Sequence, residues 1–378
     1  MQTHSEQGST APAPWSAPAA NDLRGRWDCE CGKTLRFERY LAGKKARCPA
    51  CGRGFTIPQL APAAGAELTM RGHNGPIHSV AFSPDGRLLA TTADIVSSDA
   101  AKSELAETIL WDTGSGSASA ILHWHRKPVG TLAFSPDGRL LASGSKDHSI
   151  SIWNVERGLW DAVMGVHERA LRGHQAQVTS VAFSPDGQTL ASAAADRTVR
   201  FWNTTSWQTT AAIDTGRTGN GRLAFSPCGR YVAAVWTGRG PVTIWKTGTS
   251  EKHMELLLFR EDDTEDYGVG FSPDGTRIIV LGRNLVRIWD LTTCQVLASF
   301  EAPGSEAIAV APQANLIATG GLAPESKANV SLWDPATLLA MREFEGHTQS
   351  VAAIAFSSDG KMLASGGRDG VANLWLVG

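Results

Sequence analysis

Residues 178–203 read VTSVAFSPDGQTLASAAADRTVRFWN, and this stretch decides the fold. Three apolar and β-branched runs, VTSVAFS, TLASAA and VRFWN, are separated by turn-forming residues, which predicts three β-strands. Ser184-Pro185-Asp186-Gly187 fits a type I turn, because Pro presets φ at the second position and Gly tolerates positive φ at the fourth. We therefore expect the strands to run antiparallel, with a fourth strand before the next such stretch.

The same unit recurs along most of the chain. Tryptophans follow one another at intervals of 42 to 49 residues, at Trp111, Trp153, Trp202, Trp245, Trp289, Trp333 and Trp375. Each is preceded by a copy of the FSPDG turn, starting at Phe82, Phe134, Phe183, Phe225, Phe271 and Phe356, with a degenerate copy, VAPQA, at Val310. A period of this length indicates one structural unit repeated seven times. Four short strands cannot bury both faces alone, so we expect the units to stack radially.

These motifs resemble those of WD-repeat β-propellers, and the resemblance covers residues 66–378. The shared marks are a Gly-His pair, the SPDG turn, an inner strand of small residues and a Trp-Asp end. Gly-His pairs stand at 72–73, 173–174 and 346–347, and Trp-Asp pairs at 111–112, 289–290 and 333–334. The resemblance implies an all-β fold, a seven-bladed β-propeller.

The resemblance also implies buried hydrogen-bonded tetrads. In that family a His, a Ser or Thr, an Asp and the Trp indole join in one network within a blade. The matching positions form three complete sets: His125-Ser143-Asp147-Trp153, His174-Ser192-Asp196-Trp202 and His347-Ser365-Asp369-Trp375. Such a network rigidifies a blade, because it gives the buried indole N–H an acceptor.

Four units depart from the tetrad pattern. The first has His73, Thr91 and Trp111, but an insertion leaves the choice of its Asp open between Asp94 and Asp99. In units four to six the expected His is replaced by Gly216, Asp262 and Glu301. We expect apolar packing to hold these three blades.

The seventh unit supplies only three strands before Gly378. Residues 67–73, ELTMRGH, resemble residues 342–347, REFEGH, which form an outer strand leading into a Gly-His pair. We therefore expect residues 66–71 to complete the seventh blade, which would remove an open sheet edge.

Four of the six cysteines form two pairs, Cys29 with Cys31 and Cys48 with Cys51. Paired cysteines at this spacing indicate a metal site, and four thiolates suit one structural Zn²⁺ with tetrahedral geometry. A segment of roughly 35 residues cannot build a sufficient core, so the metal would supply the folding free energy. The alternative is two disulfides in a secreted protein.

This cysteine-containing segment resembles the small zinc ribbons found near the N-terminus of many bacterial multidomain proteins. The pattern C-x-C-G-K, L-A-G-K, C-P-x-C-G is matched almost residue for residue. Short strands are expected at 34–37 and 45–47 around a turn at Gly43, with a third at 55–57. The two remaining cysteines, Cys228 and Cys294, are expected to be unpaired and structurally incidental.

The sequence thus divides into a disordered tail at 1–22, a zinc ribbon at 23–58, a linker at 59–65 and the propeller at 66–378. The tail is rich in Ala, Pro and Ser and lacks the basic start and apolar core of a signal peptide. No apolar run approaches 18 residues, so no membrane span is expected. We expect a cytoplasmic monomer.

The resemblance implies a non-catalytic scaffold whose loops bind protein or peptide partners, with the ribbon as an accessory binding module. Loops on a rigid scaffold often carry function. The extra loop at 95–107 supplies the candidate partner-binding residues Asp99, Lys102 and Glu104, and the long span after Trp153 supplies Trp160. An exposed tryptophan can anchor a partner, although long loops also pack on themselves.

Nucleic-acid binding through the ribbon is the alternative function. Residues 21–60 hold nine Lys and Arg against four Asp and Glu, a balance of +5, which zinc bound by four thiolates lowers to about +3. Phe37 and Tyr40 are available to stack on bases.

An enzyme is not expected. The sequence contains no Walker loop, no dinucleotide-binding glycine pattern, no HExxH and no GxSxG. His, Ser and Asp in one network suggest a hydrolase, but a triad is recognised by geometry and exposure. Several copies around a ring favour the structural interpretation.

Overall fold

The structure is a computed structural model of the chain. It describes residues 24–28, 34–38, 45–47, 51, 54–56, 66–94, 106–155, 166–217, 219–237, 240–256, 266–282, 284–321 and 330–377. The chain divides into two compact units, Met1–Ala63 and Ala64–Val377, and each is described by itself. The predicted tail and linker lie outside the described residues.

The first unit contains two separate β-hairpins, β1 (Arg24–Asp28) with β2 (Thr34–Glu38) and β3 (Lys45–Arg47) with β4 (Gly54–Thr56). The structure confirms the predicted short strands at 34–37 and 45–47, and the third lies at Gly54–Thr56 instead of 55–57. The expectation that the first two lie around one turn at Gly43 is wrong, because β2 pairs with β1, which was not predicted, and β3 pairs with β4. Each hairpin instead brackets one cysteine pair in the sequence. The physical reason is local, because adjacent strands joined by a short connection pair at the lowest entropic cost.

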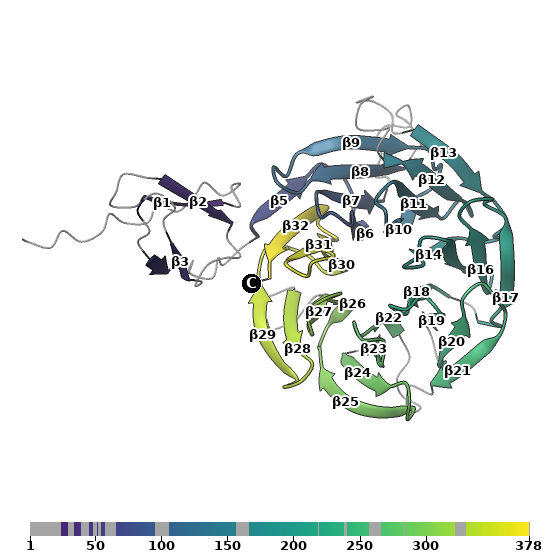
Figure 1. The fold of residues 1–378 in the computed structure, drawn as a ribbon. Coiled ribbons are helices and arrows are strands. Elements are labelled where there is room, and N and C mark those ends of the chain that lie inside the picture. Colours follow the sequence, from purple (N-terminus) through teal and green to yellow (C-terminus); the bar gives the residue numbers. More distant parts are fainter. Residues whose placement is uncertain are drawn as a thin grey trace, which may run out of the picture. The chain divides into compact units, whose positions relative to one another are not determined.

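The second unit is a ring of seven antiparallel sheets with four strands each, which confirms the predicted seven-bladed all-β propeller. Figure 1 shows the first strand of each sheet near the centre of the ring and the fourth strand at its rim. The seventh sheet has the order β30-β31-β32-β5, so its fourth strand comes from the start of this unit.

The strands of blades one to three are β6 (Ile77–Phe82), β7 (Leu88–Ala93), β8 (Glu107–Asp112), β9 (Ala118–His123), β10 (Val129–Phe134), β11 (Leu140–Ser145), β12 (Ile150–Asn154), β13 (Val166–Leu171), β14 (Val178–Phe183), β15 (Thr189–Ala194), β16 (Thr198–Asn203) and β17 (Thr209–Asp214). Those of blades four and five are β18 (Gly221–Phe225), β19 (Tyr231–Trp236), β20 (Val242–Lys246), β21 (Lys252–Leu256), β22 (Asp266–Phe271), β23 (Arg277–Gly282), β24 (Leu285–Asp290) and β25 (Gln295–Glu301). Those of blades six and seven are β26 (Ser305–Val310), β27 (Ile317–Gly321), β28 (Val330–Asp334), β29 (Leu339–Phe344), β30 (Val351–Phe356), β31 (Met362–Gly367), β32 (Val371–Leu376) and β5 (Leu68–Arg71).

The SPDG turn connects the first two strands of a blade as its sequence predicts. In blade three the Gly187 N–H donates to the Ser184 carbonyl at 2.8 Å, and Gly187 has a φ of +71°. Ser184 Oγ donates to Asp186 Oδ1 at 2.6 Å and accepts from the Thr189 N–H at 2.9 Å. The side chains therefore satisfy the turn's polar groups, and the backbone can reverse direction within four residues.

A register shift lies beside the tryptophan in six of the seven sheets. Where the third strand pairs with the fourth, the alignment shifts between the tryptophan and the residue before it, for example at Ile152/Trp153 and Phe201/Trp202. An extra residue on one strand bends it and increases its twist. Blades that share this bulge therefore share a twist, which favours regular stacking around the ring.

Small residues on the second strands let neighbouring blades approach closely. A Cβ added to Gly144 would lie 2.7 Å from Val178 Cγ1 of the next blade, and one added to Gly366 would lie 2.5 Å from Ile77 Cγ2. Both distances are shorter than van der Waals contact, so only glycine fits. The core of the propeller thus lies between blades, where each glycine receives an apolar side chain.

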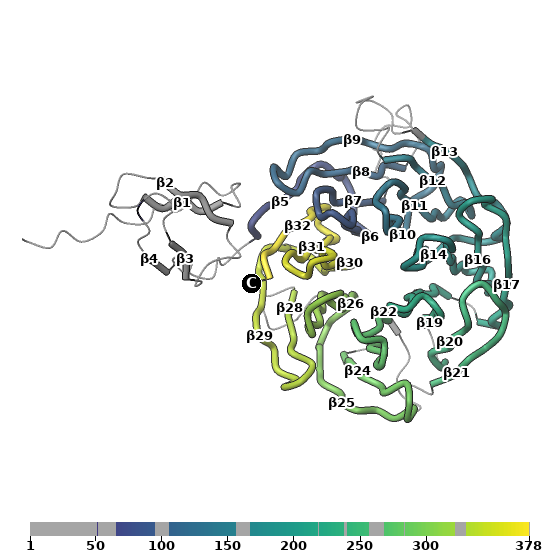
Figure 2. Tube along the Cα trace, viewed as in Figure 1, coloured from purple at the N-terminus to yellow at the C-terminus, as the bar shows by residue number. Residues whose placement is uncertain are grey.

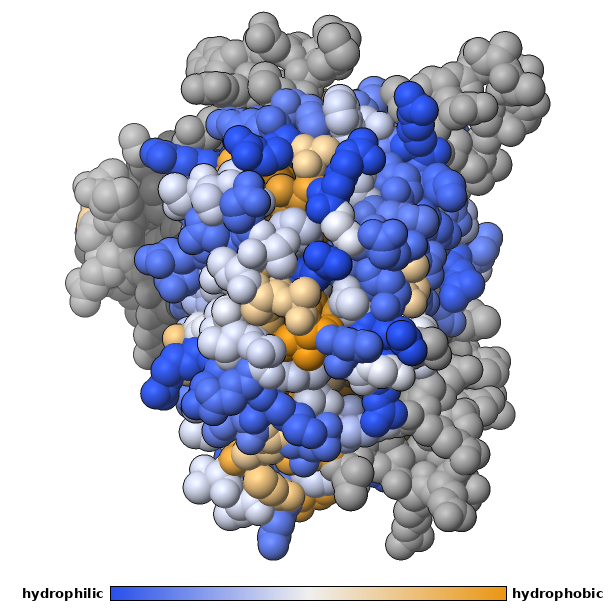
Figure 3. All heavy atoms as spheres, turned by 90° about the vertical axis from the view of Figure 1, so that its right-hand side faces the viewer, coloured by the Kyte–Doolittle hydropathy of each residue, from blue (hydrophilic) through white to orange (hydrophobic). Residues whose placement is uncertain are grey.

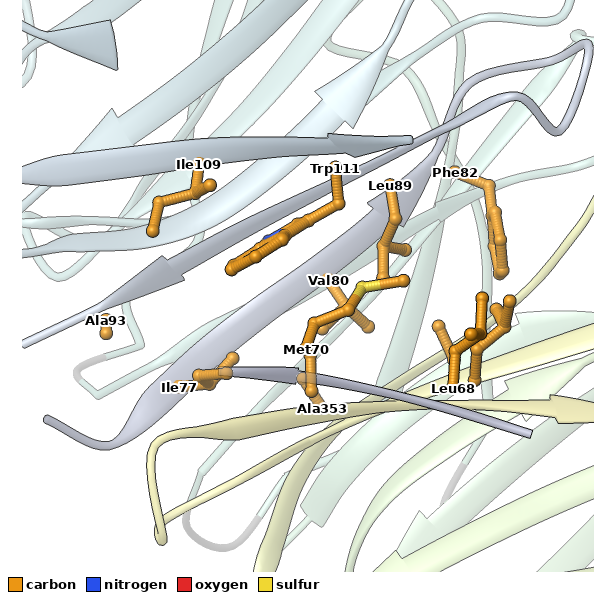
Figure 4. Packing of buried hydrophobic residues seen from close by; sticks show 13 residues of the cluster. Leu68, Met70, Ile77, Val80, Phe82, Leu89, Ala93, Ile109, Trp111 and Ala353 are labelled. Carbon is orange, nitrogen blue, oxygen red and sulfur yellow. The ribbon is translucent and has the colours of Figure 1, made fainter. Parts of the chain in front are cut away.

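Residues 66–71 close the ring. β5 pairs antiparallel with β32, with Leu68 opposite Leu374. Figure 2 shows β5, from the start of the unit, beside β32, from its end. Leu68 and Met70 are 3% and 1% exposed, and Figure 4 shows them extending toward the apolar side chains of blade one, among them Leu89. The start of this unit is therefore held in the last blade by backbone pairing, and its apolar side chains join that blade to blade one.

The rim of the propeller is polar for the most part on the side that Figure 3 shows. Figure 3 looks onto one side of the rim and shows apolar residues only in small, separate patches. Among the residues that the structure describes, we find no helix with the length and hydropathy that crossing a bilayer requires.

Candidate functional site

Blade two contains the predicted network of four side chains. His125 Nδ1 lies 3.0 Å from Asp147 Oδ2, and His125 Nε2 lies 3.0 Å from Ser143 Oγ. Trp153 Nε1 donates to the same hydroxyl at 2.9 Å. The network ties the loop before β10 to the end of β11 and to β12, so it fixes the loops at one face of the ring.

Blades three and seven repeat this geometry. The distances in blade three are 3.0 Å from His174 to Asp196, 2.8 Å from His174 to Ser192 and 2.8 Å from Trp202 to Ser192. Those in blade seven are 3.2 Å from His347 to Asp369, 2.7 Å from His347 to Ser365 and 2.8 Å from Trp375 to Ser365. All three tetrads proposed from the sequence are thus brought together.

The tetrads are structural. Ser143, Ser192 and Ser365 are each 0% exposed, so their hydroxyls offer no nucleophile that a substrate can reach. Burial is the larger cause that lowers the pKa of His174, and it outweighs the opposing effect of Asp196. Burial raises the pKa of Asp196, but the Gln175 N–H, Thr198 and His174 outweigh it and bring the pKa to about 2.

Blade one has a network without a carboxylate among the described residues. His73 Nε2 lies 2.7 Å from Thr91 Oγ1, and Trp111 Nε1 donates to Thr91 Oγ1 at 2.7 Å. Asp94, one of the two candidates for the missing member, lies 2.9 Å from His78 instead. Burial lowers the pKa of His73 to about 4, and no described carboxylate contacts the ring to oppose this effect. The other candidate, Asp99, lies outside the described residues.

Blades five and six differ in how they satisfy the indole. Trp333 Nε1 donates to Thr319 Oγ1 at 2.9 Å, whereas buried Trp289 Nε1 has no partner in the described part of the chain. The sequence indicates the hydroxyl acceptor in blade six, because Thr319 follows the marker residue Val310 by nine positions, as Ser192 follows its marker Phe183. Blade five has Val280 there, and this valine packs with Trp289 in one apolar cluster.

A cavity of about 320 Å³ lies at the mouth of the central channel. Its lining includes the second residue of the first strand of six blades: His78, Gly130, Thr179, Arg222, Glu306 and Ala352. These first strands surround the centre of the ring in Figure 1. The mouth therefore lies at the face where the tetrads hold the loops.

Two groups of ion pairs lie at this channel mouth. Arg368 Nη2 lies 2.7 Å from Glu306 Oε2. Asp94 lies 2.9 Å from His78 and 3.6 Å from Lys146 Nζ. Burial raises the pKa of Asp94, but His78 and Lys146 outweigh it, so the pKa lies below its ordinary value. Asp94 therefore links blade one to blade two across the mouth.

Arg222 is the exception at the mouth. It is partly buried, and among the described residues its guanidinium has no hydrogen bond or ion pair. Burial lowers its pKa from the ordinary value, because the cation loses hydration without gaining a carboxylate. Arg222 was not predicted from the sequence. It lies three positions before its marker, Phe225, whereas the other five first-strand residues of the mouth lie four positions before theirs.

The remaining predicted residues lie mostly outside the described part of the chain. This holds for the candidate partner-binding residues Asp99, Lys102, Glu104 and Trp160 and for the candidate zinc ligands Cys29, Cys31 and Cys48. Cys51 is an exposed turn residue between β3 and β4. The predicted loop 95–107 ends earlier than expected, because Glu107 begins β8.

The SPDG turn of blade four contains Cys228 in place of Asp. Ser226 Oγ lies 3.3 Å from Cys228 Sγ. Burial raises the thiol pKa, but Ser226 and Arg230 outweigh this effect and lower it to about 7. Cys228 lines a second cavity of about 310 Å³ between blades four and five, together with His253 and Phe271.

The comparison with protein families agrees with these networks. The family "WD domain, G-beta repeat" (WD40) matches residues 66–99, 116–154, 165–203 and 340–375. The chain contains WD40 repeats. The matched stretches hold the four histidines that share a hydroxyl with a tryptophan, so these WD40 repeats are the ones with side-chain networks.

Curated relatives of these WD40 repeats are similar over a limited region. The chain is 30% identical to Protein groucho of Drosophila melanogaster over 149 residues, which are 37% of this chain and 20% of that protein. It is 31% identical to Transducin-like enhancer protein 2 of Mus musculus over 149 residues, 37% of this chain and 19% of that protein. It is 29% identical to the CCR4-associated factor 4 homolog of Candida glabrata over 125 residues, which are 32% of this chain and 20% of that protein. The chain thus aligns with about a fifth of each relative.

Proposed function

We propose that this chain is a non-catalytic scaffold whose WD40 propeller binds a protein or peptide partner at the channel-mouth face. The observation that carries the proposal is the cavity of about 320 Å³ built by first strands from six blades. The loops around it are held by buried networks, so a partner would meet a preorganised surface at a low entropic cost. One relative, the CCR4-associated factor 4 homolog, has a name that describes association with another factor, which is consistent with this function.

The long connection in blade one supports the same face. Residues 95–105 join Asp94 to Ala106. Asp94 pairs with Lys146 at the mouth, and the Ala106 N–H donates to the His125 carbonyl at 2.8 Å. Both ends of the connection are therefore anchored at this face. We propose that Asp99, Lys102 and Glu104 contribute to the partner surface, and that Trp160 belongs to a separate one.

The test uses the immobilised full-length chain and a cell lysate, with bound proteins quantified by mass spectrometry. We expect a specific set of proteins to be retained by the wild type and lost when 95–105 is replaced by a short turn. The matched control shortens 157–164, the connection that contains Trp160. It should keep the proteins that are lost on replacing 95–105, and it should lose only proteins bound at the separate surface. The proposal would be contradicted if the chain retained no more proteins than a propeller of unrelated sequence does. It would also be contradicted if neither deletion changed the set of retained proteins.

We also propose that Cys29, Cys31, Cys48 and Cys51 hold one structural Zn²⁺. In support, the two hairpins of the first unit each bracket one cysteine pair, so two short connections supply four thiols. This donor set suits tetrahedral zinc in a closed structural site. Elemental analysis should find one zinc per chain, and none after Cys48→Ser and Cys51→Ser. Thiol titration that finds two disulfides would contradict the assignment.

Nucleic-acid binding by the ribbon is the second candidate function. The observation that favours it is the register of the first hairpin, which places Arg26 opposite Arg36. Like charges at opposite positions destabilise a strand pair unless an anion lies nearby, and a phosphate would supply it. A gel shift at low salt with the full-length chain should weaken in Arg26→Gln with Arg36→Gln and with rising salt. The absence of a shift at low salt would end this candidate.

A further inference from the structure

The charge balance of the channel mouth is uneven. Lys146, Arg222 and Arg368 face Asp94 and Glu306, which leaves one positive charge when His78 is neutral. The two carboxylates are already paired, so the excess charge resides on Arg222. A guanidinium has five N–H donors in a fixed fork, which matches the two oxygens of a carboxylate.

We propose that Arg222 anchors a carboxylate of the partner, an Asp or Glu side chain that enters the channel mouth. The inference rests on the proposed function and specifies the partner's chemistry. One unpaired cation is complementary to one carboxylate, whereas a phosphate dianion would leave a net negative charge in a confined space. The bound carboxylate would replace the hydration that Arg222 loses through burial.

The mouth also has room for an entering side chain. Gly130 and Ala352 hold two of the six first-strand positions in its lining, and neither fills space. A Cβ added at Gly130 would meet only the Val178 carbonyl oxygen, 3.9 Å away. The space beside the Gly130 Cα is therefore free of close neighbours, unlike that beside Gly144 or Gly366, so the fold can accept a larger side chain at this position.

The neighbours of Arg222 can orient a carboxylate without competing for the guanidinium. Gln177 Nε2 donates to Asn220 Oδ1 at 3.0 Å, and the Asn220 N–H donates to Thr237 Oγ1 at 3.0 Å. These neutral groups line the same cavity as Arg222. They form a polar wall on blades three and four that bears no formal charge, so the preference for an anion comes from Arg222.

The test selects peptides from a random phage-displayed library on the immobilised full-length chain. We expect the selected peptides to share an Asp or Glu whose replacement by Asn or Gln weakens binding about tenfold to a hundredfold. Arg222→Gln should cause the same loss of affinity for the acidic peptide. For the peptide that carries Asn or Gln in place of the acidic residue, the variant and the wild type should have the same affinity. Gly130→Leu should also reduce binding, because its side chain occupies the mouth.

Arg87→Gln is the matched control, since its side chain is 84% exposed in the turn of blade one, and it should bind as the wild type does. Thermal unfolding of Arg222→Gln should match or exceed that of the wild type, because a cation without a partner contributes no pair to stability. Failure to select any peptide would contradict the proposed function itself.

Two results would overturn the carboxylate inference while leaving the scaffold function standing. One is selected peptides that bind equally to the wild type and to Arg222→Gln. The other is a phosphoserine version of a selected peptide that binds more tightly than the acidic version and depends on Arg222. The first would place the binding site elsewhere, and the second would assign the mouth to phosphate.

Discussion

At the residue scale, single positions decide how each blade holds its tryptophan. Thr319 provides an acceptor for Trp333, whereas Val280 provides none for Trp289. Blades with an acceptor and a histidine have polar networks, and blade five depends on apolar packing. A buried indole without a partner loses a hydrogen bond that water would have supplied, which costs roughly 1–3 kcal/mol. Blade five is therefore expected to be less stable than blades two and three.

Restoring the consensus turn in blade four should stabilise the protein. Asp186 accepts from Ser184 Oγ at 2.6 Å, whereas Cys228 offers a weak sulfur acceptor 3.3 Å from Ser226 Oγ. We expect Cys228→Asp to raise the free energy of unfolding by about 1 kcal/mol, as measured by denaturant titration at neutral pH. Cys294→Asp, at an exposed position outside such a turn, should change it by less than about 0.5 kcal/mol. Equal effects of the two variants would refute this account.

Acid should destabilise the propeller partly through His73. The folded-state pKa of about 4 lies below the ordinary 6.5, so the unfolded chain takes up a proton first as the pH falls. The stability contributed by neutral His73 is present above pH 6.5 and is lost between pH 6.5 and 4, by about 3 kcal/mol. The pH dependence of the unfolding free energy should be flatter in His73→Asn. Exposed His123→Asn should keep the wild-type slope.

At the scale of elements, β5 is expected to contribute the most to the stability of the ring for its length. It pairs with β32, and its apolar side chains enter the cluster shared by the first and last blades. A free edge on β32 would expose unpaired backbone groups and the apolar surface of both blades. The closure element therefore couples two ends of the unit that lie about three hundred residues apart in the chain.

Two variants test this closure. Deleting 66–71 should lower the melting temperature of the entire propeller, measured by tryptophan fluorescence, while deleting 1–58 should not. Met70→Ala should cost about 2–5 kcal/mol, because Met70 is 1% exposed. Met341→Ala, at a methionine 60% exposed on the outer strand of blade six, should cost less than about 0.5 kcal/mol. An unchanged melting curve after deletion of 66–71 would mean that β5 does not stabilise the ring.

At the scale of the whole molecule, the two compact units differ in what holds them. The propeller has a distributed apolar core between blades, whereas the first unit has two short hairpins and four cysteines. A unit of that size depends on a metal or cross-link, and a propeller does not. The two units should therefore respond differently to removal of zinc.

A chelator strong enough to strip zinc should unfold the first unit alone. We expect amide proton exchange in residues 24–56 to accelerate greatly, because the proposed zinc would supply the folding free energy of this unit. The melting temperature of the propeller should change by no more than about 2 °C, since its core lacks the metal. If the amides of both units stayed protected from exchange after chelation, the zinc assignment would be wrong. If both units unfolded together, they would not be independent.

The sequence alone determined the repeat, the strand order within a blade and three of the side-chain networks. These depend on residues at most about thirty positions apart, such as His174 and Trp202, whose spacing recurs in blades two and seven. It did not determine the pairing within the first unit, where 45–47 was the expected neighbour of Thr34–Glu38 and the unpredicted strand Arg24–Asp28 pairs with it instead.

Only the tertiary structure decided what surrounds the central channel. Arg222, Glu306 and Gly130 have little local relation in the sequence, and closure of the ring brings them to one mouth. The state of each charge there depends on partners contributed by other blades, as with Arg368 and Glu306. Periodicity in the sequence predicts where a strand forms. Whether a cation such as Arg222 has a charged partner depends on residues from several blades, so it is seen only in the folded structure.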